Sequence, residues 1–244
     1  MVVKSQIKLI KSLHLKKNRQ LHEQFIIEGV KGVEQALSNG LFPHLLCATT
    51  PNLLAEAYTE FRVHMVSATE LSQMSALKNP SGFLGVFQIP KPQPVDYSDW
   101  VLALDGVQDP GNLGTIIRLC DWFGVRHILC AMGTVDAYNP KVVQATMGSI
   151  GRVQLHYVDL AATLASAPVE VLGTFMDGQP ISNAKFNTPG IVVMGNEGQG
   201  ISEEIAALVS RKISIPAHHT ATTESLNVAN AAGIAMYEIR RSSL

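Results

Sequence analysis

The chain has 244 residues, of which 46% are hydrophobic, and its formal net charge at pH 7 is -1. A chain of this size can bury one large core or two modest ones, and no apolar run approaches the ~20 residues of a membrane-spanning helix. The N-terminal segment also lacks the apolar core of a signal peptide. These features argue against a membrane protein and a secreted one, so we expect a cytoplasmic protein of two domains.

Cysteine and histidine usage argues against a disulfide framework and against a metal site. The three cysteines, Cys47, Cys120 and Cys130, are odd in number and form no CxxC pair. Of the eight histidines, His218 and His219 are adjacent, and no further Cys or His follows them at ligand spacing. We therefore expect reduced, partly buried thiols and no bound metal.

Positive charge is concentrated near the N-terminus. Residues 1–31 carry seven of the 19 Lys and Arg residues, and the remainder of the chain is net acidic. A basic segment beside an acidic body suits a polyanion such as RNA, although a solvated basic helix explains the charge almost as well. Lys16, Lys17 and Arg19 are our candidates for RNA positioning through phosphates; their alternative role is that of ordinary surface residues.

Residues 1–90 alternate between helical and strand patterns. Residues 4–15 place Leu9, Ile10 and Leu13 on one side and lysines on the other, which predicts a short amphipathic helix. We interpret Lys16–Arg19 as its polar exit. The further predicted strands are 25–27, 45–48, 63–66 and 83–89, and the further predicted helices are 28–37, 53–61 and 68–77. This alternation predicts a small α/β domain over residues 1–90.

Three prolines among the five residues Pro90–Pro94 cannot belong to a helix or an inner strand, so we predict a proline-rich linker over residues 91–98. The strands predicted after it are 100–104, 126–131, 153–158, 169–175 and 191–194, with helices at 112–123 and 140–147. Continuous apolar strands separated by helices are typical of a parallel sheet covered on both faces. Residues 99–244 are therefore predicted as a second α/β domain.

Three stretches of this second domain combine a polar loop with the start of a helix or the end of a strand. They are Asp105–Val125, Gly190–Ser202 with three glycines within six residues, and Ile215–Glu238. In the last of these, Ser225 stands where a helix N-cap belongs, and capping alone would explain it. Apolar and small residues after Leu226 occupy most faces of the helix that follows, so we expect that helix to be buried nearly all round.

The glycine loop after the strand at 191–194 has the order GxxGxG. The dinucleotide fingerprint is GxGxxG, so an NAD-binding Rossmann domain is disfavoured. Parallel sheets bind ligands at the carboxyl ends of their strands, which is where these loops lie.

Together the three stretches resemble the SpoU/TrmH branch of the SPOUT superfamily of RNA methyltransferases, from Trp100 to Arg241. The residues that match the family motifs are Asn112 and Arg118 in the first; Asn196, Glu197, Gly198 and Gly200 in the second; and Ile215, Pro216, Ser225, Leu226 and Asn227 in the third. The segment Ala217–Glu224 is longer than the family pattern and lacks its usual glycine. Residues 1–90 resemble, at fewer positions, the RNA-binding domain that many SpoU-type enzymes carry.

The resemblance implies a parallel-sheet SPOUT domain with a deep trefoil knot, which ordinary topology rules would not predict. It also implies S-adenosyl-L-methionine as cofactor and methyl transfer to a ribose 2′-hydroxyl of RNA. Ribosomal RNA is the first expected substrate and transfer RNA the second. The family is dimeric through its C-terminal domain, so we expect a homodimer.

Site residues follow from the matched motifs. The expected catalytic residues are Asn112, Arg118, Glu197, Ser225 and Asn227, and the expected cofactor-binding residues are Met194, Gly195, Asn196, Gly198, Gly200, Ile215, Pro216, Leu226 and Asn227. Arg118 is also an expected RNA contact: a guanidinium stays protonated, so we expect it to hold a phosphate and lower the pKa of the hydroxyl. Glu197 is equally well explained by hydrogen bonds to loop amides.

Two other kinds of protein remain open at this point. The first is an RNA-binding or ribosome-assembly protein that kept the fold and lost catalysis, against which the intact motif residues argue. The second is a generic nucleotide-binding α/β protein, which would differ in its cofactor preference.

Overall fold

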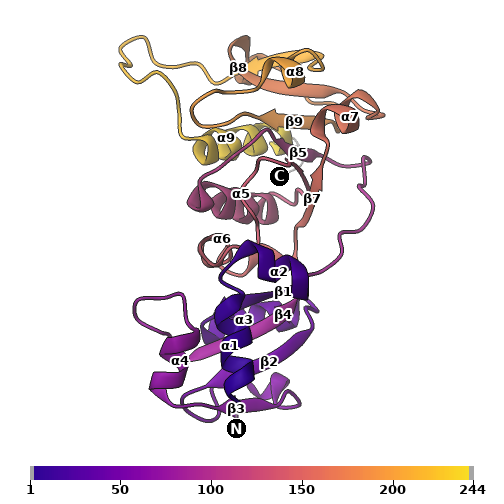
Figure 1. The fold of residues 1–244 in the computed structure, drawn as a ribbon. Helices are drawn as coiled ribbons and strands as arrows, with labels where there is room; N and C mark the ends of the chain where they lie inside the picture. The colour runs from indigo at the N-terminus through magenta and orange to yellow at the C-terminus, as the bar shows by residue number, and fades with distance from the viewer. Residues whose placement is uncertain (1–2, 242–244) are drawn as a thin grey trace. The chain divides into compact units, whose positions relative to one another are not determined.

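The computed structural model describes residues 3–241, and the chain forms two compact units (Figure 1). Unit 1 is formed by residues up to Lys91 together with Asp136–Arg152, and unit 2 by Pro92–Val135 and the residues from Val153 onward. The segment 136–152, which the linear prediction places in the second domain, folds with unit 1. The outermost ends of both predicted domains, residues 1–2 and 242–244, lie outside the described residues.

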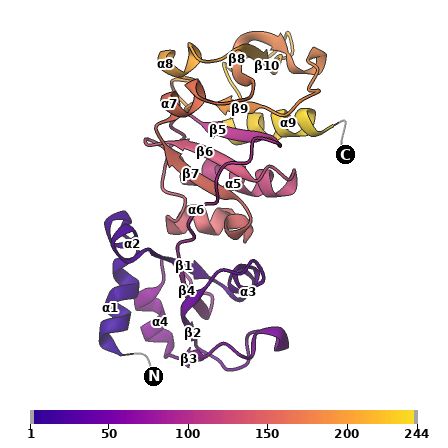
Figure 2. The same ribbon diagram turned by 90° about the vertical axis from the view of Figure 1, so that its right-hand side faces the viewer.

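Unit 1 is built on a mixed four-stranded sheet. Its strands are β1 (Gln24–Glu28), β2 (Pro43–Ala48), β3 (Val63–Met65) and β4 (Phe83–Gln88), in the order β1-β4-β2-β3. Helices α1 (Lys4–Ser12) and α4 (Ala68–Met74) contact each other and share a buried core with one face of the sheet. Helix α3 (Val30–Ser38) lies on the opposite face (Figure 2), and α6 (Pro140–Ala145) packs on β1.

Most predicted elements of unit 1 are present with small shifts at their ends, and two predictions were wrong. Residues 16–19 are not a polar exit but begin a second helix, α2 (Lys16–His22). The predicted helix over residues 53–61 is only a short 3₁₀ turn, η1 (Glu56–Tyr58), none of whose residues is buried. A short segment without a buried face gains too little from packing to offset the cost of helix nucleation.

Arg19 lies inside unit 1, with 2% of its surface exposed. Its guanidinium donates to the carbonyl oxygens of Leu13 and His14 at 2.8 and 2.9 Å, and to Oδ2 of Asp136 at 2.9 and 2.5 Å. The expectation that Arg19 contacts RNA is therefore corrected, because its charge is buried and paired. The ion pair ties α2 to the segment 136–152.

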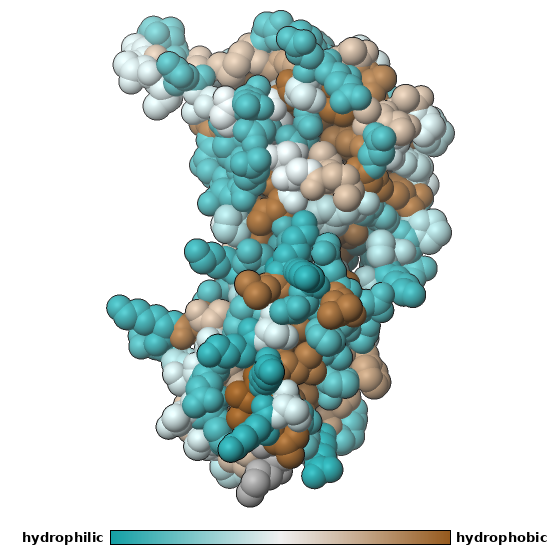
Figure 3. Space-filling model, viewed as in Figure 1, coloured by the Kyte–Doolittle hydropathy of each residue, from teal (hydrophilic) through white to brown (hydrophobic). Residues whose placement is uncertain are grey.

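The other two basic candidates, Lys16 and Lys17, are exposed on α2. Two leucines beside them are also exposed, Leu15 at 64% and Leu21 at 71%. Figure 3 accordingly shows a mostly hydrophilic surface over α1 and α2 with hydrophobic residues between the hydrophilic ones. Lys16 and Lys17 remain predicted RNA contacts.

Unit 2 contains the parallel sheet that the sequence predicts. Its strands are β5 (Val101–Leu104), β6 (His127–Ala131), β7 (Gln154–Val158), β8 (Val171–Pro180), β9 (Ile191–Met194) and β10 (Arg211–Ser214). All neighbours in the order β10-β8-β9-β5-β6-β7 are parallel. Helices cover both faces: α5 (Pro110–Trp122) and α9 (Val228–Arg240) on one, α7 (Leu160–Ala165) and α8 (Glu203–Ala206) on the other (Figures 1 and 2).

Helix α9 is buried on one side only, so the prediction of a helix buried nearly all round was wrong. Ala232, Ala235 and Met236 are fully buried, and Leu119 of α5 lies beside Gly233. Ile234 and Tyr237, however, are 38% and 48% exposed.

Within the described residues, no helix is long and apolar enough to cross a membrane.

We predict that Arg19→Ala lowers the free energy of unfolding by about 3–5 kcal/mol, because it leaves Asp136 without its buried partner. Urea denaturation of the full chain measures this loss. Lys17→Ala changes an exposed residue of the same helix and should leave the midpoint almost unchanged. Equal midpoints for the two variants would show that the ion pair does not hold unit 1 together.

Candidate active site

The candidate site lies at the carboxyl edge of the sheet of unit 2, where the central strands β5 and β9 run side by side. The backbone N–H of Asp105 donates to the carbonyl of Met194 at 2.9 Å, and the Asp105 carboxylate accepts from the N–H of Ser202 at 2.7 Å. These bonds hold the loop after β5 against the loop after β9. This edge is where parallel sheets bind ligands.

Helix α5 begins at this edge for a reason that is visible in the sequence Asp109-Pro110. Asp109 is the N-cap, and its carboxylate accepts from the backbone N–H of Asn112 at 2.8 Å. Pro110 occupies the first helical position, where no N–H is needed. Asn112 is therefore held in the first turn of α5, facing the loop after β9.

A chain of side-chain hydrogen bonds joins the three predicted motifs. The amide nitrogen of Asn112 donates to the Glu197 carboxylate at 3.0 Å, and its amide oxygen accepts from Asn227 Nδ2 at 2.8 Å. We call this the Glu197–Asn112–Asn227 chain. Its members come from three segments that are far apart in the sequence, so the fold brings together the residues that sequence reasoning singled out.

Glu197 is held at the start of α5 by further donors. It accepts from the backbone N–H groups of Gln108 and Asp109, each at 3.3 Å. Partial burial raises the pKa of Glu197, but the hydrogen bonds from Asn112 and from backbone N–H groups outweigh it and hold the pKa below its ordinary value. The carboxylate is therefore ionised at neutral pH.

The glycine turn after β9 is folded around Asn196. The Asn196 amide donates to the carbonyl of Gly106 at 2.7 Å and accepts from the N–H groups of Gly198 and Gln199 at 2.9 and 3.2 Å. Gly200 has a φ of +72°, which favours glycine. A side chain at Gly195 would overlap the backbone of Gly200, so the turn requires glycine at both positions.

Only part of the third motif contacts the other two motifs. Asn227, not Ser225, is the N-cap of α9, and its side-chain oxygen accepts from the N–H groups of Ala229 and Asn230. The prediction that Ser225 caps this helix was wrong, because Ser and Asn are both good caps and pattern alone does not choose between positions two residues apart. Ile215 is half-buried, whereas Pro216, Ser225 and Leu226 are exposed. Within the described residues, the Ser225 hydroxyl makes no hydrogen bond.

Arg118 lies on α5 about 9 Å along the helix axis from Asn112 and is exposed. Among the residues that the structure describes, its guanidinium has no hydrogen-bond or ion-pair partner. The surface ion pair that would be the ordinary explanation of Arg118 is therefore not formed. Its charge stands available to an anionic ligand.

Sequence reasoning missed the role of Asp105 and Asp109, which position the two loops. The Asp-Pro pair followed by an apolar helix is a recognised start signal and could have identified Asp109. The bond from Asp105 to Ser202 joins residues that only the sheet brings together.

The chain is similar to known proteins in sequence and in fold. Residues 99–237 match the model of the SpoU rRNA Methylase family, and residues 4–85 match an MRM3-like substrate binding domain. The chain is 32% identical to the 23S rRNA (guanosine(2553)-2′-O)-methyltransferase RlmP of Bacillus subtilis, over 94% of each chain. Two solved structures are also similar. One is a protein from Porphyromonas gingivalis assigned to the TrmH family of RNA methyltransferases, with 37% identity and a TM-score of 0.90 over 99% of each chain. The other is the AdoMet bound rRNA methyltransferase from Sinorhizobium meliloti, with 30% identity and a TM-score of 0.87 over 100% of this chain and 97% of that one.

We predict that Glu197→Gln lowers the free energy of unfolding at pH 7 by about 1 kcal/mol, a charged hydrogen-bond contribution reduced for solvent exposure. Because the folded-state pKa of Glu197 is lowered, its stabilisation is present above the unfolded-state pKa. It is lost as the pH falls through the folded-state value. The urea midpoints of the parent chain and the Glu197→Gln variant should therefore differ at pH 7 and converge in acid. Glu224→Gln, in the exposed loop, should show no such dependence.

Proposed function

The chain belongs to the SpoU rRNA methylase family, and we propose that it transfers a methyl group from S-adenosyl-L-methionine to a ribose 2′-hydroxyl of ribosomal RNA. The observation that carries this proposal is the Glu197–Asn112–Asn227 chain, which assembles the three motifs at the ligand-binding edge of the sheet. A relative matched over 94% of the chain is a 23S rRNA 2′-O-methyltransferase by name, which favours ribosomal over transfer RNA.

The residues at this edge fit the cofactor. Gly198 and Gly200 lie in an exposed turn and have no side chains to cover its backbone. Apart from its chain neighbours, no atom lies within 4 Å of the position that a Cβ on Gly200 would take. Such backbone suits the polar atoms of a nucleoside, and the half-exposed Leu226 offers an apolar surface. When bound, S-adenosyl-L-methionine supplies a methyl carbon that its sulfonium has already activated. The remaining proposed cofactor residues are Met194, Gly195, Asn196, Ile215, Pro216 and Asn227.

The protein's own contribution to the reaction is chiefly alignment. Holding the ribose oxygen in line with the transferable methyl group can lower the barrier by ~7–11 kcal/mol. Arg118, exposed and without an internal partner, binds the phosphate next to the reacting ribose and lowers the pKa of the 2′-hydroxyl. The proton leaves to phosphate or water, because a guanidinium does not accept it. Glu197, Asn112 and Asn227 hold the site in shape around these groups, and the exposed Ser225 belongs to the loop that completes it.

Unit 1 is the proposed RNA-binding part of the protein, through Lys16 and Lys17, with residues 91–98 as the linker to the methyltransferase domain. We also propose the trefoil knot of the family for unit 2. In support, α9 at the C-terminal end packs on α5 and on the central strand β9. Cytoplasmic localisation stays a prediction.

A homodimer through unit 2 is supported by exposed aromatic side chains on α5 and α9. Trp122 is 82% exposed and Tyr237 is 48% exposed, and the ring of Tyr237 packs edge-on against Phe123 with the centroids 6.5 Å apart. Large exposed aromatic groups are typical of interfaces, and a patch on one helix pair suits a two-fold contact.

We predict that Arg118→Ala lowers methyl transfer to ribosomal RNA by about 10²-fold or more, since one charge that stabilises the transition state is lost. The measurement is incorporation of labelled methyl from S-adenosyl-L-methionine into separated ribosomal and transfer RNA. Cofactor binding should be unchanged in this variant. Near-normal turnover of Arg118→Lys would contradict a role for the planar guanidinium, and label confined to transfer RNA would replace the proposed substrate.

We predict that Trp122→Glu converts the dimer to a monomer, because a carboxylate buried in the interface in place of the exposed indole would be unpaired. Light scattering coupled to size-exclusion chromatography measures the mass. Leu21→Glu, which changes an exposed leucine of unit 1, serves as the matched control. A parent chain that elutes as a monomer at all concentrations would rule out the dimer.

A further inference from the structure

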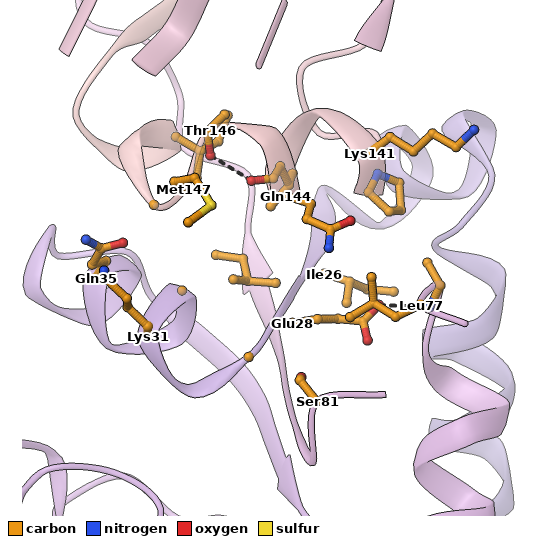
Figure 4. A pocket seen from close by; sticks show the side chains of 18 of the residues that line it. Ile26, Glu28, Lys31, Gln35, Leu77, Ser81, Lys141, Gln144, Thr146 and Met147 are labelled. Atoms are coloured by element: carbon orange, nitrogen blue, oxygen red, sulfur yellow. Dashed lines mark hydrogen bonds between the residues drawn. The ribbon is translucent and has the colours of Figure 1, made fainter. Parts of the chain in front are cut away.

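Unit 1 contains a cavity of about 360 Å³ that has no part in the proposed methyl transfer (Figure 4). Its walls come from β1 and α3, from residues 76–81, and from α6 with the turn that follows it. A volume of this size lies near the lower end of the range of small-ligand pockets, ~300–1,000 Å³. It is large enough for a single nucleobase but not for an extended chain.

Apolar side chains form part of the cavity lining. Ile26 on β1 and Leu77 lie together on one side, and Gln144 points toward them from α6, whereas Met147 lines the cavity from the turn after α6 (Figure 4). Ile26 and Ile150 are almost completely buried, so this part of the lining is apolar. A flat aromatic ligand is held well between such surfaces.

One amide oxygen on the wall has hydrogen-bonding capacity that the protein leaves unused. The side-chain oxygen of Gln35 is buried and has no hydrogen-bond partner within the described residues. An unpaired buried acceptor is unfavourable, and an N–H group of a ligand would satisfy it. Glu28, in contrast, is already engaged by the hydroxyl of Ser75 and the N–H of Ala76.

Two lysines border the cavity. Lys31 and Lys141 both line it and are both exposed. Over the part of the chain that the structure describes, neither is paired with a carboxylate. Ammonium groups beside an apolar cavity suit a ligand whose planar part enters and whose phosphates remain outside.

Met147 adds a second sign of ligand binding. It adopts a φ of +51° although it is not glycine, and 55% of it is exposed. A flexible apolar side chain in an unfavourable backbone conformation, at the mouth of a cavity, is a feature that packing alone does not explain.

We propose that this cavity receives one unstacked base of the RNA substrate, with Lys31 and Lys141 on the flanking phosphates and Met147 over the base. The proposal rests on the proposed function, because it takes the RNA to be the methylated one. The recognised chemistry is a nucleobase with an adjacent phosphate, which a free nucleotide also carries. The experiment therefore separates these two sources.

The test is photocrosslinking of the full chain to in vitro transcribed large-subunit ribosomal RNA that contains 4-thiouridine, with the crosslinked peptides mapped by mass spectrometry. We expect crosslinks within residues 26–35 and 140–148. Met147→Gly, which relieves the backbone, and Gln144→Trp, which fills the cavity, should each weaken RNA binding about tenfold, because the first removes the contact over the base and the second blocks its entry. Asn52→Gly makes a comparable change at another positive φ outside the cavity and outside the basic segment, and it should bind RNA normally.

The results distinguish a failure of the cavity proposal from a failure of the proposed function. Normal methyl transfer by the parent chain, with unchanged RNA binding by Met147→Gly and Gln144→Trp, would overturn the cavity proposal and leave the function intact. Crosslinks in the cavity without methyl transfer would support the cavity and overturn the proposed function. Displacement of the crosslink by micromolar nucleoside monophosphates, with no effect of either variant on RNA binding, would identify a site for free nucleotides instead.

Discussion

The arrangement of the loops in unit 2 depends on the two hydrogen bonds of the Asn112 side chain. Its one amide donates to Glu197 and accepts from Asn227, so it uses both kinds of hydrogen-bonding group to connect two loops and a helix start. Since Asn227 also caps α9, the position of the C-terminal helix is coupled to the first turn of α5. An amide can do this because it carries a donor and an acceptor on one rigid plane; a carboxylate or a hydroxyl at position 112 would not satisfy both neighbours in the same geometry.

Unit 1 depends on a comparable contact, with different chemistry. The buried guanidinium of Arg19 neutralises Asp136 and satisfies two carbonyl oxygens near the end of α1. Through this ion pair the segment 136–152 is joined to the N-terminal part of the chain. The segment contains α6 and Met147, which line one wall of the cavity.

Patterns that report local preference were reliable here. The strand at 191–194 was predicted with its observed ends, and the parallel sheet of unit 2 follows from continuous apolar runs that need cover on both faces. The predicted helix at 53–61 failed because local propensity without a buried face does not hold a helix. The N-cap was placed at Ser225 instead of Asn227, because both residues cap well and the decisive partner, Asn112, lies more than a hundred residues earlier.

The sequence by itself determined the alternation of strands and helices, the parallel sheet and the three motifs whose residues meet at its edge, since these depend on side-chain periodicity and on short-range turn chemistry. Only the tertiary structure decided that Arg19 is buried, that Ile234 and Tyr237 of α9 remain exposed, and that residues 136–152 fold with unit 1. The physical reason is the same in each case. Whether a charge is solvated or paired, and whether an apolar face is covered, depends on partners distant in the chain, which no local pattern specifies.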